Sequence, residues 1–199
     1  MARKIFFSFH YERDAWRAGQ VRNSNVVASE DEYGFVDAAE WESIKKKGDA
    51  EIKRWIADQL KNTSVTVVMI GAETADREWV QHEIEKSWNR GNGIVGVRIH
   101  NIKDQNKQSD TAGRNPLDGF TLANGSLLSS ICKTYDWVLE DGRKNLGKWA
   151  DEAAEIRAAQ GSDDLESLGE QQGASKGRVT SIASSGFAPR SPWSQGHAE

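Results

Sequence analysis

Apolar residues in this chain form short runs that alternate with amphipathic stretches. Residues 5–9, 65–70 and 94–99 are apolar almost throughout, as is typical of strands buried on both faces of a sheet. A brief apolar run at residues 34–37 and a segment within residues 131–138 predict two more strands. The pattern therefore predicts five strands.

Helical spacing of apolar residues separates these runs. The clearest case is residues 49–60, where one stripe holds Ile52, Trp55, Ile56 and Leu60. Further helices are predicted at residues 12–23, at residues 76–88 and after the last strand.

The helix at residues 76–88 carries signals at both of its ends. Thr74 or Asp76 is expected to cap its start, because short polar side chains bond the free amides there. Gly91 is expected to end it, since glycine is favoured just past a helix terminus.

Strands that alternate with helices indicate an α/β fold. We expect a flavodoxin-like, doubly wound, five-stranded parallel sheet with helices on both faces, within a domain at residues 1–159. Residues 160–199 are rich in Gly, Ser and Gln and lose apolar periodicity, which predicts a disordered tail. The alternative for that tail is a partner-binding segment around residues 187–193, where prolines and aromatic residues cluster.

Composition narrows the class of protein. The 199 residues carry a net charge of −4, which disfavours a nucleic-acid-binding surface. One cysteine and four scattered histidines provide neither a disulfide nor a zinc site. Apolar segments are too short for a signal peptide or a membrane span, so we expect a cytoplasmic protein without membrane contact.

The predicted topology places a ligand crevice where the first and third predicted strands end. Ligands of open parallel sheets bind outside the carboxyl ends of the strands, where the strand order reverses. Residues 8–11 and 71–74 leave those two strands. Residues 10–14 contain no phosphate-cradling glycine and no metal-ligand cluster occurs, so we expect no bound flavin, other cofactor or metal.

Trp79 and Glu83 stand out in the helix that follows. They are four residues apart and share a helix face, so they can present an apolar ring beside a carboxylate. The alternative is that Trp79 belongs to the core and Glu83 is an ordinary solvated glutamate. In either case we expect Glu83 at an accessible helix position.

Several motifs together resemble the TIR family. In order, they are Phe6-Phe7-Ser8-Phe9, Phe35-Val36-Asp37, Gly48 with Ile52, Ser64 before Val65, and Trp79-Val80-Gln81-His82-Glu83, in which Val80 replaces the family's usual cysteine. A closer resemblance, over residues 1–150, is to the TIR-like subunits of Thoeris anti-phage systems. It adds Asn62-Thr63-Ser64-Val65-Thr66, Gly91-Asn92, Asn115-Pro116 with Asp118, and Tyr135-Asp136-Trp137-Val138 with Asp141-Gly142.

The resemblance implies an enzyme that consumes NAD as its substrate. On phage infection it would release a cyclic ADP-ribose-type signal that activates a separate effector protein. By motif, Glu83 would be the catalytic residue and Trp79 the motif tryptophan. The same resemblance places Phe7, Ser8 and His10 around the substrate, and Asn115 in a family motif that we also assign to substrate binding.

The residue types suit that chemistry. Breaking the bond between nicotinamide and ribose builds positive charge on the ribose, as in glycoside hydrolysis. A fixed carboxylate stabilises that charge, and the cationic nicotinamide leaves without a general acid.

Two other functions stay open at this point. One is a non-enzymatic TIR-like assembly module that self-associates through residues 38–48, which carry Trp41 and three lysines. The other is a nucleoside deoxyribosyltransferase-like enzyme, whose glycosidic chemistry is also built on a glutamate.

Overall fold

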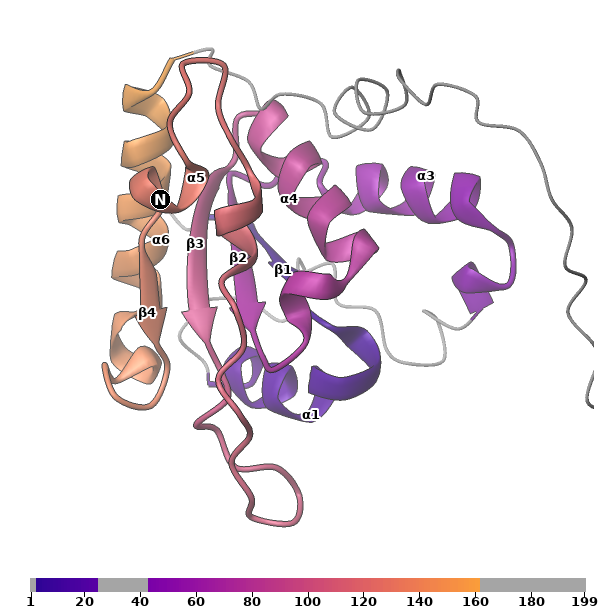
Figure 1. Cartoon of the computed structure of the whole chain (residues 1–199), viewed down its shortest axis with the longest axis vertical. Helices are drawn as coiled ribbons and strands as arrows, with labels where there is room; N and C mark the ends of the chain where they lie inside the picture. The colour runs from indigo at the N-terminus through magenta and orange to yellow at the C-terminus, as the bar shows by residue number, and fades with distance from the viewer. Residues whose placement is uncertain (1–2, 25–42, 162–199) are drawn as a thin grey trace, which may run out of the picture. The chain divides into compact units, whose positions relative to one another are not determined.

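A computed structural model of the chain describes residues 3–24 and 43–161. Its centre is a parallel sheet in the order β1-β2-β3-β4 (Figure 1). The strands are β1 (Ile5–Ser8), β2 (Val65–Ile70), β3 (Gly93–Arg98) and β4 (Thr134–Asp136). This confirms the α/β class and four of the predicted strands. The fifth predicted strand, at residues 34–37, lies outside the described residues.

The strand order confirms the predicted neighbours. β1 pairs directly with β2, with Ser8 opposite Val68. The first and third predicted strands therefore lie side by side, as a flavodoxin-like order requires.

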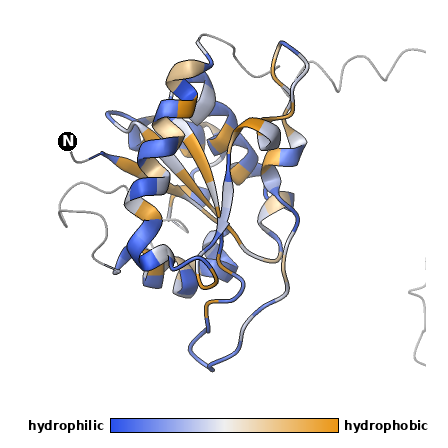
Figure 2. Cartoon of the chain, turned by 90° about the vertical axis from the view of Figure 1, so that its left-hand side faces the viewer, coloured by the Kyte–Doolittle hydropathy of each residue, from blue (hydrophilic) through white to orange (hydrophobic). Residues whose placement is uncertain are grey.

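Helices occupy the predicted intervals between the strands. They are α1 (Tyr11–Arg22), α3 (Asp49–Gln59), α4 (Glu78–Asn89), the short α5 (Leu128–Ile131) and α6 (Gly142–Ala159), with 3-10 turns η1 (Thr74–Asp76) and η2 (Pro116–Gly119). In Figure 2 the strands at the centre are largely apolar and the outer helix surfaces largely hydrophilic. No helix within the described residues combines the length and apolar character that a membrane span needs.

The predicted start of α4 was wrong, whereas its predicted end is confirmed. Arg77 occupies the N-cap position and no side chain caps it. Thr74 Oγ1 instead accepts a hydrogen bond from the Gly71 amide at 2.9 Å, which fixes the turn after β2. Gly91 follows the helix with φ of 93°, a conformation that favours glycine.

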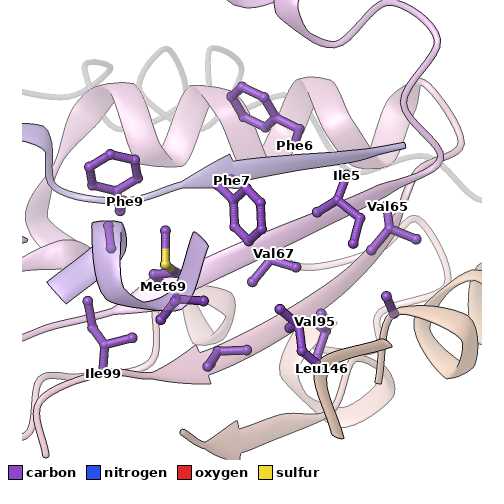
Figure 3. Packing of buried hydrophobic residues seen from close by; sticks show 14 of the residues in the cluster. Ile5, Phe6, Phe7, Phe9, Val65, Val67, Met69, Val95, Ile99 and Leu146 are labelled. Carbon is purple, nitrogen blue, oxygen red and sulfur yellow. The ribbon is translucent and has the colours of Figure 1, made fainter. Parts of the chain in front are cut away.

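One face of the sheet makes hydrogen bonds to α4, and apolar side chains pack on the sheet as well. Successive residues of a strand point to opposite faces. Ser8 and Thr66 point toward α4, because each hydrogen-bonds a side chain of that helix. Phe6 and Phe7 leave β1 on opposite sides, and Phe7 points toward Val67 (Figure 3).

The segment between β3 and η2 extends beyond the carboxyl ends of the strands (Figure 1). Two arginines of α1 hold it. Arg17 donates to the carbonyls of Ile102 at 2.9 Å and Gln108 at 3.2 Å, and Arg13 donates to Asp110 at 3.0 Å. This long polar segment is therefore anchored across the end of the sheet where the site was predicted.

Candidate functional site

The centre of the candidate site is the carboxylate of Glu83, in the middle of α4. Ser8, the last residue of β1, donates its hydroxyl to Glu83 Oε2 at 2.6 Å. Tyr11, the first residue of α1, donates to Oε1 at 3.3 Å. The strand end and the helix that the sequence placed at one crevice therefore meet at this carboxylate.

Glu83 is completely buried, which corrects the expectation of an accessible or solvated position. Burial raises the pKa of its carboxyl from 4.5 to about 8, although the hydrogen bonds from Ser8 and Tyr11 act in the opposite direction. With that pKa, Glu83 is mostly a neutral acid at pH 7 in this arrangement.

A cavity of about 330 Å³ is lined in part by Tyr11, whose hydroxyl contacts this carboxylate. The β1–α1 junction supplies one wall and the η1–α4 junction supplies another. The lining residues are Phe9, His10, Tyr11, Glu12, Lys45, Asp76, Arg77, Glu78, Trp79 and Val80. Several are aromatic, and both signs of charge are present.

His10 lines this cavity and carries a buried ring nitrogen. Its Nδ1 is buried and has no hydrogen-bond partner within the described part of the chain, while its Nε2 lies 3.9 Å from Glu12. Burial, reinforced by the positive charge of Arg77, lowers the pKa of His10 below 6.5. An unpartnered buried polar atom is costly unless a ligand or water satisfies it, so His10 is suited to binding.

Trp79 also lines the cavity, as an aromatic half-buried beside the core. Its ring meets that of His82 edge-on, with the centroids 6.2 Å apart. Trp79 and Glu83 lie one helical turn apart, as predicted. In this structure, however, the tryptophan faces the cavity and the carboxylate is covered.

Three other predicted binding residues do not line the cavity. Phe7 packs in the hydrophobic core. Ser8 is buried and donates its hydrogen bond to Glu83. Asn115 caps η2 by accepting from the Leu117 amide and donates to Thr134 at 3.2 Å, which joins η2 to β4.

Sequence reasoning placed Tyr11 at the crevice, within residues 8–11, but gave it no role. It lies three residues after Ser8 and directly follows His10, which the sequence did assign to the site. Its role depends on α1 beginning at that residue, which aims the phenol at α4. Lys45, which forms an ion pair with Glu12 at the cavity, was missed.

Comparison of the sequence with known proteins identifies the family of this chain. Residues 6–104 match the family model of the Thoeris protein ThsB, TIR-like domain. The chain is 35% identical over 190 residues to a Bacillus cereus (strain MSX-D12) protein named "Putative cyclic ADP-D-ribose synthase ThsB1". That match covers 75% of this chain and 99% of the relative. The chain therefore belongs to the ThsB family of TIR-like Thoeris proteins.

Proposed function

We propose that this protein cleaves NAD at the bond between nicotinamide and ribose and joins the remainder into a cyclic ADP-ribose-type product. One observation carries the proposal. A carboxylate at the TIR glutamate position is built into the crevice end of the sheet, held by Ser8 and Tyr11 beside an aromatic cavity. The name of the 35% identical relative describes the same reaction class.

The proposed reaction needs one charged group at the ribose. The bond from ribose C1′ to the nicotinamide nitrogen breaks, and its electron pair leaves with neutral nicotinamide. The ribosyl group becomes cationic, and the ionised carboxylate of Glu83 stabilises that charge. A nitrogen of the adenine or a hydroxyl of the second ribose then bonds C1′ and releases a proton.

The cavity wall suits the other parts of NAD. Trp79 and His10 offer flat rings for a base. Arg77 and Lys45 bring positive charge that suits a pyrophosphate, in exchange for their present pairing with Glu73 and Glu12.

Cyclisation also requires that water be kept from the ribosyl cation. The carboxylate of Glu83 has no solvent access in this structure, so the reacting end of the site is dry before substrate binds. A dry site favours capture by another part of the same molecule over hydrolysis.

The biological setting follows from the same proposal. A phage trigger would start synthesis, and the diffusible product would activate a separate effector protein. Self-association through residues 38–48 stays a prediction. Residues 38–42 of that stretch lie outside the described part of the chain, and Lys46 and Lys47 are exposed.

The experiment is to incubate the purified protein with NAD and, separately, with a mixture of deoxynucleosides. Products are separated by liquid chromatography and identified by mass spectrometry. Extract from phage-infected cells is added to a parallel set of reactions to supply the trigger. We expect nicotinamide and a cyclic product from NAD. Base exchange between deoxynucleosides would indicate a deoxyribosyltransferase, and no product in any reaction would favour an assembly module.

A further inference from the structure

We propose that Tyr11 is a gate that separates Glu83 from the substrate cavity, and that activation withdraws its side chain. The proposal concerns the regulation of the NAD site and rests on the function proposed above. It explains how a catalytic carboxylate can be present and yet covered until a trigger arrives.

The position of Tyr11 carries this inference. Of the two hydroxyls that bind Glu83, that of Tyr11 comes from a residue lining the cavity, whereas Ser8 is buried and does not line it. Glu83 has no exposed surface and does not belong to the cavity lining within the described residues. A substrate in this cavity would therefore meet the phenol of Tyr11 before it could reach the carboxylate.

Aromatic contacts hold Tyr11 in the closed position. Its ring centroid lies 4.3 Å from that of Phe9 and 6.5 Å from that of Trp55, which it meets edge-on. Phe9 belongs to the same β1–α1 junction, but Trp55 belongs to α3, a separate element. The closed position therefore depends in part on where α3 lies.

The segment that leads into α3 also reaches this site. Lys45 forms an ion pair with Glu12, the residue next to Tyr11. Residues 43–59 thus contact the Tyr11 region twice, once through Lys45 and once through Trp55. Binding or self-association that displaces this segment would loosen both contacts together and allow the phenol to move.

Electrostatics agree with a closed resting state. Burial favours the neutral form of Glu83, which cannot stabilise a ribosyl cation. Withdrawal of Tyr11 would bring the substrate, with its cationic nicotinamide, against the carboxyl and favour the charged form. Opening would therefore supply access and charge in one step.

The test compares the full-length wild type with Tyr11→Ala and Tyr11→Phe. Alanine removes the aromatic side chain that covers Glu83, whereas phenylalanine keeps the ring and removes only the hydroxyl. A water-soluble carbodiimide with an amine labels accessible carboxyls, and peptide mass spectrometry reports the labelling rate at Glu83. Turnover of NAD without a trigger is measured on the same samples.

We expect Glu83 labelling to rise about ten- to thousandfold in Tyr11→Ala, since minor open states are commonly populated at about 0.1–10%. Untriggered NAD turnover should rise in the same variant. Tyr11→Phe should stay close to wild type in labelling. Tyr135→Ala is the control, because Tyr135 of β4 stacks on Trp149 of α6 and should not affect Glu83.

The two measurements distinguish a failure of the Tyr11 gate from a failure of the proposed NAD activity. Unchanged labelling of Glu83 in a folded Tyr11→Ala protein would overturn the gate. Increased labelling with no NAD product in any variant, triggered or not, would support the gate and overturn the proposed function. If Tyr11→Ala does not fold, Trp55→Ala provides the second variant. It should raise the labelling of Glu83 by a smaller factor, and no rise there would overturn the gate.

Discussion

At the scale of single residues, the buried carboxyl of Glu83 indicates function more than stability. Burying an ionisable group lowers stability, and strongly shifted pKa values concentrate at functional sites. The fold accommodates this carboxyl with hydroxyls from two separate elements. An apolar side chain would fill the same space without this desolvation.

The raised pKa of Glu83 makes the stability of the protein depend on pH. The folded state holds the proton up to about pH 8, whereas the unfolded chain releases it near 4.5. The unfolded state therefore binds fewer protons between these values, and stability falls as pH rises through this window. We expect Glu83→Gln, which cannot ionise, to lack this fall. Urea unfolding of both proteins at pH 5 and pH 8 measures it, and parallel pH dependences would contradict the assigned pKa.

Ser8 should tune the ionisation of Glu83. Its hydrogen bond lowers the pKa of the carboxyl, so its loss should raise that pKa further. We expect Ser8→Ala to move the rising limb of the pH–rate profile for NAD turnover to higher pH. A change in the maximum rate with an unmoved limb would show that Ser8 acts in some other way.

At the scale of elements, α4 joins the sheet through a stripe that mixes apolar and polar residues. Val80, Glu83 and Ser87 lie at positions i, i+3 and i+7 of the helix and are all buried. The two polar members hydrogen-bond strand residues, Glu83 with Ser8 and Ser87 with Thr66. Sequence reasoning paired Glu83 with Trp79 and expected an accessible position, and so it missed the burial of Glu83.

The sequence predicted most elements well, for identifiable reasons. β2 has the bounds that its β-branched run indicates, and α4 ends near Gly91. The predicted cap of α4 failed because the hydroxyl of Thr74 binds the Gly71 amide in the preceding turn. Whether the Thr74 hydroxyl binds the Gly71 amide or caps α4 depends on the path of the chain after β2. The periodicity of apolar residues does not encode that path.

Close packing of α6 on β3 gives a test at this scale. A Cβ added at Gly93 would lie 2.4 Å from the Ala153 carbonyl oxygen, so α6 would have to move. We expect Gly93→Ala to cost at least about 1–3 kcal/mol of unfolding free energy, as overpacking does. Gly147→Ala in α6 meets no atom within 4 Å and should stabilise the helix by about 0.5–1 kcal/mol. Chemical denaturation measures both, and equal stabilities would contradict this packing.

At the scale of the whole molecule, long-range ion pairs arrange the loops around the site. Arg13 binds Asp110 and Glu73, and Arg114 binds Asp76. These pairs join residues 38 to 97 positions apart in the chain. Sequence patterns predicted a long polar loop here but not its anchoring, because no periodicity relates such distant charges.

The domain boundary predicted near residue 159 remains a prediction, although α6 does end at Ala159. The apolar periodicity that builds the core stops there, so the residues beyond have little to bury. We expect a protein that ends at residue 161 to keep its thermal midpoint within a few degrees of the full chain. Differential scanning calorimetry measures this, and a large drop would show that the tail packs on the domain.

The central claim is that Glu83 performs the chemistry, and its direct test is NAD turnover by the triggered protein carrying Glu83→Gln. Glutamine keeps the size of the acid and one accepting oxygen but cannot carry the charge that faces a ribosyl cation. Glu85→Gln is the matched control, since Glu85 lies on the same helix and contacts Lys86. We predict a loss of about 10²- to 10³-fold for Glu83→Gln and near wild-type turnover for Glu85→Gln. Wild-type turnover by Glu83→Gln, or an equal loss in Glu85→Gln, would contradict the assigned site.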